Sequence, residues 1–169
     1  MHAIEPLGER DETLRDFARS ELFERTFQDG MDLVEQAAAY LDGEGRQESK
    51  LLSRNAALAY AGESMRLTTR LMQVASWLLV QRAVREGDMS AAAARDDRYR
   101  LNARDPAPEP APRAVRAELP SGLTSLSDRA QRLHERVRHL DRRMYIEPAD
   151  ATGNAVLSHM DRLKSAFGG

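Results

Sequence analysis

The sequence predicts an all-α protein: an antiparallel three-helix bundle with one very long central helix. Three observations support this prediction. Residues 47–87 contain no proline and consist mainly of strong helix formers. Apolar residues also recur at helical spacing over about 20–42 and 124–146. Segments rich in glycine or proline separate the three stretches, and such segments often connect the helices of a bundle.

We expect the central helix over residues 48–87, with an extension to about residue 100. At about 1.5 Å per residue it would be roughly 60 Å long, so it needs packing partners along most of its length. Two columns of residues with a seven-residue period are predicted to form its core seam. One column has large side chains and the other has small ones, and small side chains let a neighbouring helix approach closely. The large column is Leu51, Leu58, Met65, Met72 and Leu79, and the small column is Asn55, Gly62, Thr69, Ser76 and Ala83.

A narrow polar strip along the central helix contains the candidate binding residues, together with Trp77, the only tryptophan of the chain. An exposed tryptophan is costly and often marks a binding hot spot. We therefore predict a partner-binding or dimer-binding surface on this strip. The alternative is that Trp77 is covered by the core, by a terminal arm or by a second subunit. The predicted binding residues are Arg66, Arg70, Gln73 and Trp77.

The first helix and the central helix are predicted to form an antiparallel hairpin. Residues 1–17 are charged and lack a helical period, so we expect a mobile acidic N-terminal arm before the bundle domain of residues 18–147. The first helix then runs over about 20–42 and ends at Gly43 and Gly45. Only a short connection follows, which brings the central helix back alongside it.

The second half of the chain contains a linker, a third helix and a tail. Residues 102–121 are rich in proline and alanine and have few large apolar groups, so we predict a flexible linker that crosses back along the bundle. A proline-rich ligand for a peptide-binding domain is the alternative for this segment. The third helix should run over about 124–146, and residues 148–169 form either a short docking helix or a tail that orders on a partner. The apolar seam of the third helix is Leu126, Ala130, Leu133, Val137, Leu140 and Met144.

Composition excludes several classes of protein. The formal net charge is −2, and no concentrated basic patch of the kind found in nucleic-acid binders is present. Without cysteine, the chain has no disulfide framework and no thiolate nucleophile. No run of eighteen apolar residues free of charge occurs, so no membrane span is expected. The acidic N-terminus lacks an apolar signal region, which predicts a cytoplasmic protein.

The sequence shows no constellation of catalytic residues or metal ligands. Zinc-protease, phosphate-loop and serine-hydrolase motifs are absent. His134 and His139 are five residues apart, about 140° around a helix, and cannot share one metal ion. We therefore expect no enzyme activity, no cofactor and no metal. A histidine phosphotransfer module built on His139 or His159 is the alternative, although the small residue and glycine that follow the histidine in such modules are missing.

The stretch from Tyr40 to Gly87 resembles the RcdA family, the regulator of CtrA degradation, most specifically in its segment ESMRLTTRLMQVASWLL. The resemblance implies a cytoplasmic homodimer of three-helix subunits that acts as a proteolytic adaptor. The implied partners are the ClpX protease complex, a response-regulator-type adaptor and a cargo protein such as a cell-cycle transcription regulator. A structural or localisation scaffold without protease delivery, recruited for example to the cell pole, is the rival function.

Overall fold

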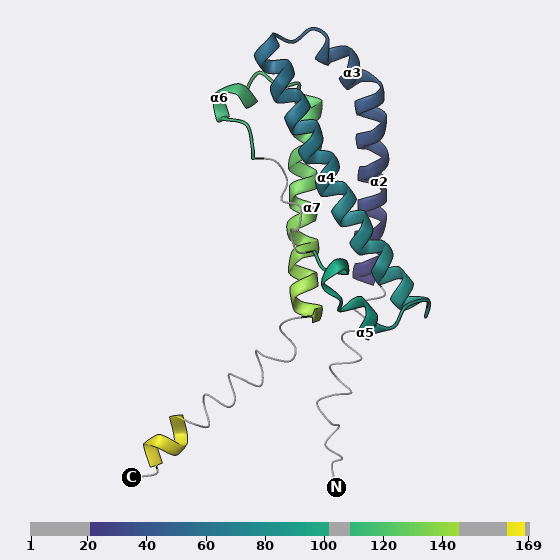
Figure 1. The fold of residues 1–169 in the computed structure, drawn as a ribbon, viewed down its shortest axis with the longest axis vertical. Helices are drawn as coiled ribbons and strands as arrows, with labels where there is room; N and C mark the ends of the chain where they lie inside the picture. Colours follow the sequence, from purple (N-terminus) through teal and green to yellow (C-terminus); the bar gives the residue numbers. More distant parts are fainter. Residues whose placement is uncertain (1–20, 102–108, 146–161, 168–169) are drawn as a thin grey trace.

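A computed structural model describes residues 21–101, 109–145 and 162–167 of the chain. Its described residues are helical or irregular, which confirms the predicted all-α class (Figure 1). The predicted N-terminal arm, much of the linker and most of the tail lie outside these residues. The long helices are α2 (Phe23–Asp42), α4 (Arg54–Arg85) and α7 (Ser121–Tyr145). The short elements are α3 (Glu44–Ser49), α5 (Ala91–Ala94), the 3₁₀ helix η2 (Asp97–Tyr99) and α6 (Arg113–Arg116), and residues 162–167 are also helical.

Helix α2 is antiparallel to both other long helices, whereas α4 and α7 run parallel. Later residues of α4 contact later residues of α7, from Arg70 with Gln131 to Gln81 with Tyr145. The connection between α4 and α7 must therefore return from one end of the bundle to the other. Consistent with this, α5 lies at the end where α4 finishes and α6 lies beside the start of α4 (Figure 1). This agrees with the predicted crossover. The segment is not a flexible linker over the whole predicted range of 102–121, because residues 113–116 form α6 and Leu119 is buried in the core.

The core lies between the three long helices. The third-helix seam was predicted correctly, with four of its members buried and Leu140 and Met144 partly buried against the core. Gly30 of α2 allows close packing on α4, because a Cβ atom there would lie 2.6 Å from Cδ1 of Leu78. The large apolar core residues are Phe23, Leu33, Leu67, Leu71, Val74, Trp77, Leu78, Leu119, Leu123, Leu126, Leu133 and Val137.

The central helix is shorter than predicted at both ends. It begins at Arg54, where the Ser53 hydroxyl accepts a hydrogen bond from the Ala56 amide, and residues 44–49 form the separate helix α3. At the other end the chain leaves α4 through Gly87, whose φ of 81° is one that favours glycine. The predicted extension to residue 100 is therefore wrong. The residues after Gly87 form α5 and η2 instead.

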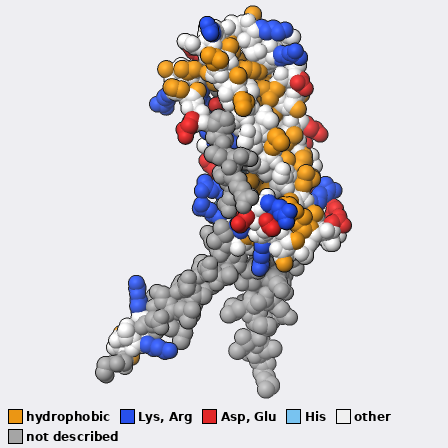
Figure 2. Space-filling view, in the orientation of Figure 1, with side chains coloured by type: hydrophobic (Ala, Val, Ile, Leu, Met, Phe, Trp, Pro, Cys, Tyr) orange, Lys and Arg blue, Asp and Glu red, His pale blue; other side chains and the backbone are white. Residues whose placement is uncertain are grey.

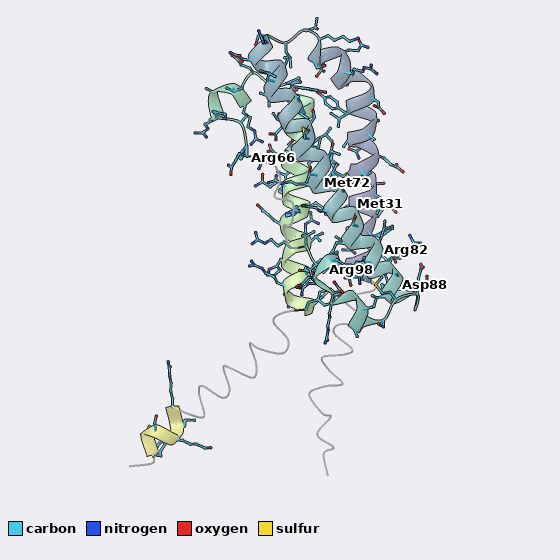
Figure 3. The ribbon with its side chains drawn as sticks, in the orientation of Figure 1. Met31, Arg66, Met72, Arg82, Asp88 and Arg98 are labelled. Carbon is cyan, nitrogen blue, oxygen red and sulfur yellow. The ribbon has the colours of Figure 1, made fainter. Side chains whose placement is uncertain are left out.

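The large column that was predicted as the core seam of α4 lies on the surface. Its five members are 54% to 87% exposed. Helix α4 is apolar around most of its circumference, so the seven-residue spacing could not show which face packs inside. In the folded chain, the polar strip turns toward α7 and the large column turns outward. Met72 of the large column and Arg66 of the polar strip, both labelled in Figure 3, are 65% and 8% exposed.

The small column is not a packing seam either, which changes the expected effect of substitutions there. A Cβ atom at Gly62 would meet no atom within 4 Å, and Ser76 is exposed, so larger residues at these positions should not overpack the core. We expect Gly62→Ala to raise the free energy of unfolding by about 0.5–1 kcal/mol, because alanine favours the helix over glycine. Urea denaturation of the purified variant measures this change.

Gly30→Ala is the matched control for Gly62→Ala. The same substitution there must displace the Leu78 side chain and should lower stability, although the helix propensity of the residue improves equally. If Gly62→Ala destabilised the protein as much as Gly30→Ala, the outward position of the small column would be contradicted.

Candidate functional site

The predicted binding residues lie between α4 and α7 of one chain. Trp77 is 2% exposed, and its indole Nε1 donates to Oδ1 of Asp141 at 2.9 Å. Arg70 and Gln73 also face α7. We call four contacts the α4–α7 polar ladder: Arg70 Nη1 with Gln131 Oε1 at 3.3 Å, Gln73 Oε1 with His134 Nε2 at 3.2 Å, Trp77 with Asp141, and Gln81 Nε2 with the Tyr145 hydroxyl at 2.6 Å.

Arg66 is also turned inward. Its side chain is buried beside that of Glu63, with Nη1 and Oε2 3.8 Å apart. Together with the ladder, this corrects the assignment of Arg66, Arg70, Gln73 and Trp77 to a partner surface. The physical reason for Arg70, Gln73 and Trp77 is that α7 presents polar groups in register with them. The ionic partner of Arg66 is Glu63 on its own helix. Buried polar side chains are stable only with such partners.

Asp141 is the most connected residue of the ladder. In addition to the Trp77 bond, it accepts hydrogen bonds from Arg100, Nε to Oδ1 at 2.9 Å and Nη2 to Oδ2 at 3.0 Å. The Arg100 guanidinium also lies 4.8 Å from the ring centre of Tyr145. The charged side chains of this pair are only 9% and 3% exposed. Since Arg100 directly follows η2, the pair fastens the start of the crossover to the end of α7.

His134 is held in the ladder in its neutral form. Burial, followed by the charges of Arg70 and Arg138, lowers the pKa of His134 below its ordinary value. The neutral ring is therefore favoured, which suits its bond to the neutral amide of Gln73. Within the described residues, no group of three or more histidine, aspartate or glutamate side chains could hold a metal ion. The same residues include no helix long and apolar enough to cross a membrane.

The opposite side of α4 forms an apolar surface with no charged group. Between Arg54 and Arg82, every exposed residue of this helix is uncharged. Figure 2 shows hydrophobic side chains along this helix and at the end of the bundle that carries α6. We call this surface the exposed α4 face. It consists of Asn55, Leu58, Ala61, Met65, Thr68, Met72, Ser76 and Leu79, and Leu51 extends it just before the helix.

The size and composition of the exposed α4 face are typical of a docking surface for another helix. From Leu58 to Leu79 it extends roughly 30 Å along the helix axis. Soluble monomers rarely leave a long apolar patch in water unless it binds something. The large side chains alternate along the face with Ala61, Thr68 and Ser76, which leaves space for the side chains of a second helix. The face carries no charged side chain, and its polar groups are the small side chains of Asn55, Thr68 and Ser76.

The sequence contains a signal that would have separated the two sides of α4. The polar residues of the strip and their partners on α7 are separated by a nearly constant 61–64 positions, as two parallel helices in register require. The large column has no matching series on α2 or α7. A polar strip whose residues have polar partners at a constant separation on another helix is typical of a buried interface. An apolar column without such partners is typical of an exposed surface.

Comparison with known proteins places the chain in a family. Residues 14–167 match the model of the family described as "Protein of unknown function (DUF1465)". The crystal structure of RcdA from Caulobacter crescentus CB15 is 64% identical, covers 78% of this chain and 98% of its own, and superposes with a TM-score of 0.65. This confirms the resemblance to RcdA. No curated protein matches the sequence. Because the family model spans most of its length, the chain belongs to the family of proteins described as DUF1465.

Proposed function

We propose that this protein is a non-enzymatic adaptor in regulated proteolysis, which brings substrate proteins to a protease by binding them. The exposed α4 face is the observation that carries this proposal, because it is a long, uncharged and largely apolar surface on which another protein could dock. The 64% identity with RcdA supports the same role. An adaptor of this kind accelerates degradation by raising the local concentration of the substrate at the protease, and no covalent step is needed.

The proposed protease is ClpXP, acting in the cytoplasm. In this proposal, a response-regulator-type adaptor prepares the ClpX complex, the present protein docks there, and a cargo such as a cell-cycle transcription regulator is delivered. These partners follow from the resemblance to the RcdA family. The contribution of the structure is a surface on which one protein partner can dock.

We further propose that the exposed α4 face joins two copies of this chain in a homodimer. A two-fold interface places the same patch of both subunits together, so any charge near the axis meets its own copy. The middle of this face, around Met65 and Thr68, has no charge to be repelled. Methionine side chains are flexible and adapt readily to a copy of the same surface.

Two charged substitutions on the exposed α4 face test the function. We expect Met65→Glu with Met72→Glu to abolish self-association, measured by light scattering after gel filtration. The same variant should lose stimulation of cargo degradation in a reconstituted ClpXP assay. Burying two carboxylates in an apolar interface is strongly unfavourable. At a concentration where the wild-type chain is monomeric, the thermal midpoint should change little, because both residues are exposed in the single chain.

Ala38→Glu with Ala39→Glu is the matched control, since it adds the same two charges at exposed positions of α2. This variant should dimerise and deliver cargo normally. Full delivery by the Met65→Glu, Met72→Glu variant would contradict the proposed function of the face. If the wild-type protein bound its partners without any change in degradation rate, the scaffold alternative would replace the adaptor.

A further inference from the structure

Two apolar surfaces of this chain are left exposed, and they belong to different segments. Among the described residues, most of the large hydrophobic side chains that stay exposed belong to the large column of α4. Apart from Leu22, the others are Leu163 and Phe167 of the C-terminal helix of residues 162–167, which are 55% and 84% exposed. Four positions apart, these two side chains lie on the same side of their helix. The chain thus contains an apolar helix face and a short apolar helix without a neighbour.

We propose that, in the single chain, the C-terminal helix docks on the exposed α4 face of its own chain, through Leu163 and Phe167, and covers part of that face until a second copy or another protein partner displaces it. The inference rests on the proposed function of the face as a docking surface. In sequence, Val156 and Met160 precede these residues with the same alternating spacing of four and three. Such spacing is the pattern by which an amphipathic helix binds a groove.

The connection is long enough for this contact. Helix α7 ends at Tyr145, whose hydroxyl accepts a hydrogen bond from Gln81, two positions beyond Leu79 of the face. The end of α7, from which the chain continues to the C-terminal helix, therefore lies close to one end of the exposed α4 face. An extended segment of residues 146–161 can span up to roughly 50 Å. This exceeds the length of the face, and a tether of this kind gives an effective concentration on the order of millimolar.

The chemistry of the two surfaces is compatible. Met65 and Met72 offer flexible thioethers, which pack favourably against an aromatic ring such as that of Phe167. Arg162 and Lys164 flank the apolar side of the C-terminal helix and can extend their charges into water beside the uncharged face. The family match also reaches residue 167, so this helix lies within the sequence that the family shares.

Cross-linking of the full-length protein tests the contact, since the natural chain has no cysteine. We would introduce Ala166→Cys together with Ser76→Cys on the exposed α4 face. The control combines Ala166→Cys with Glu35→Cys, which is exposed on the outer side of α2. With a short bismaleimide at low protein concentration, the first pair should give an intrachain product in several-fold higher yield than the control. Peptide mass spectrometry identifies the linked residues.

A charged variant of the C-terminal helix shows whether the cross-link depends on its apolar side chains. Adding Leu163→Glu and Phe167→Glu to the first pair should reduce its yield to that of the control. Equal yields from the two cysteine pairs, an unchanged yield in the charged variant, or products only between two chains would each overturn the proposal. The last outcome would assign the face to a second copy alone. No protease or cargo is present, so a failed cross-link leaves the degradation assay above as the separate test of the adaptor function.

Discussion

Trp77→Ala is expected to lower the free energy of unfolding by about 3–5 kcal/mol, the cost typical of truncating a large buried aromatic residue. Trp77 is 2% exposed and belongs to the core between α4 and α7. The substitution also removes the hydrogen bond that the indole donates to Asp141. Most of the loss should come from packing, because Arg100 still donates two hydrogen bonds to the Asp141 carboxylate. Chemical denaturation followed by circular dichroism measures it.

Met72→Ala is the control for Trp77→Ala, because it truncates a large residue on the opposite side of the same helix. Met72 is 65% exposed, so its loss should change the stability of the single chain by less than about 0.5 kcal/mol. The comparison must be made at a concentration where the chain is monomeric, since self-association would add to stability. Equal losses from both variants would contradict the orientation of α4 described above.

Asp141→Ala is expected to destabilise the fold by about 3–5 kcal/mol, the cost of removing one partner of a buried ion pair. The substitution leaves the guanidinium of Arg100 and the indole N–H of Trp77 without their acceptor in a buried site. Thermal unfolding gives the size of the loss. Combining Asp141→Ala with Arg100→Ala should recover part of it, because the charge that would be left unpaired is then also absent.

Asp128→Ala is the matched control, since Asp128 also pairs with an arginine of the crossover, Arg116. The Asp128 side chain is 51% exposed, and exposed ion pairs contribute at most about 1 kcal/mol. A loss at Asp128 equal to that at Asp141 would show that fastening the crossover matters more than burial of the charge. A small loss at both positions would contradict the structural importance of the Asp141 cluster.

The fold could be predicted largely from the sequence, because local signals define its elements. The spacing of Leu126, Leu133 and Val137 predicted both the existence of α7 and its buried side, since polar residues occupy its remaining positions. Helix α4 offered no such contrast. Its apolar residues surround most of the helix, and the side that faces inward is decided by partners such as Asp141 and Gln131, far away in sequence.

The candidate site was misassigned for the same reason. Trp77 and Arg66 are residue types that mark binding surfaces when exposed, and their types alone do not show that both are buried in the folded chain. The extension beyond Gly87 was misjudged because the alanine run after Ser90 is itself helical in composition. The chain turns at Gly87, with a φ of 81°, and the run forms the separate short helix α5.

The placement of the Asp141 cluster near the last turn of α7 has a mechanical consequence. A force applied from the C-terminal side unwinds α7 from Tyr145 backward, so the buried contacts with Trp77 and Arg100 resist it early. A force from the N-terminal side first meets the start of α2, where Phe23 is buried in the core with Arg85 over its ring, and where the exposed ion pair between Glu24 and Arg85 adds little. Unwinding from either end should therefore have to break a buried contact at once: the Asp141 cluster at the end of α7, or Phe23 at the start of α2.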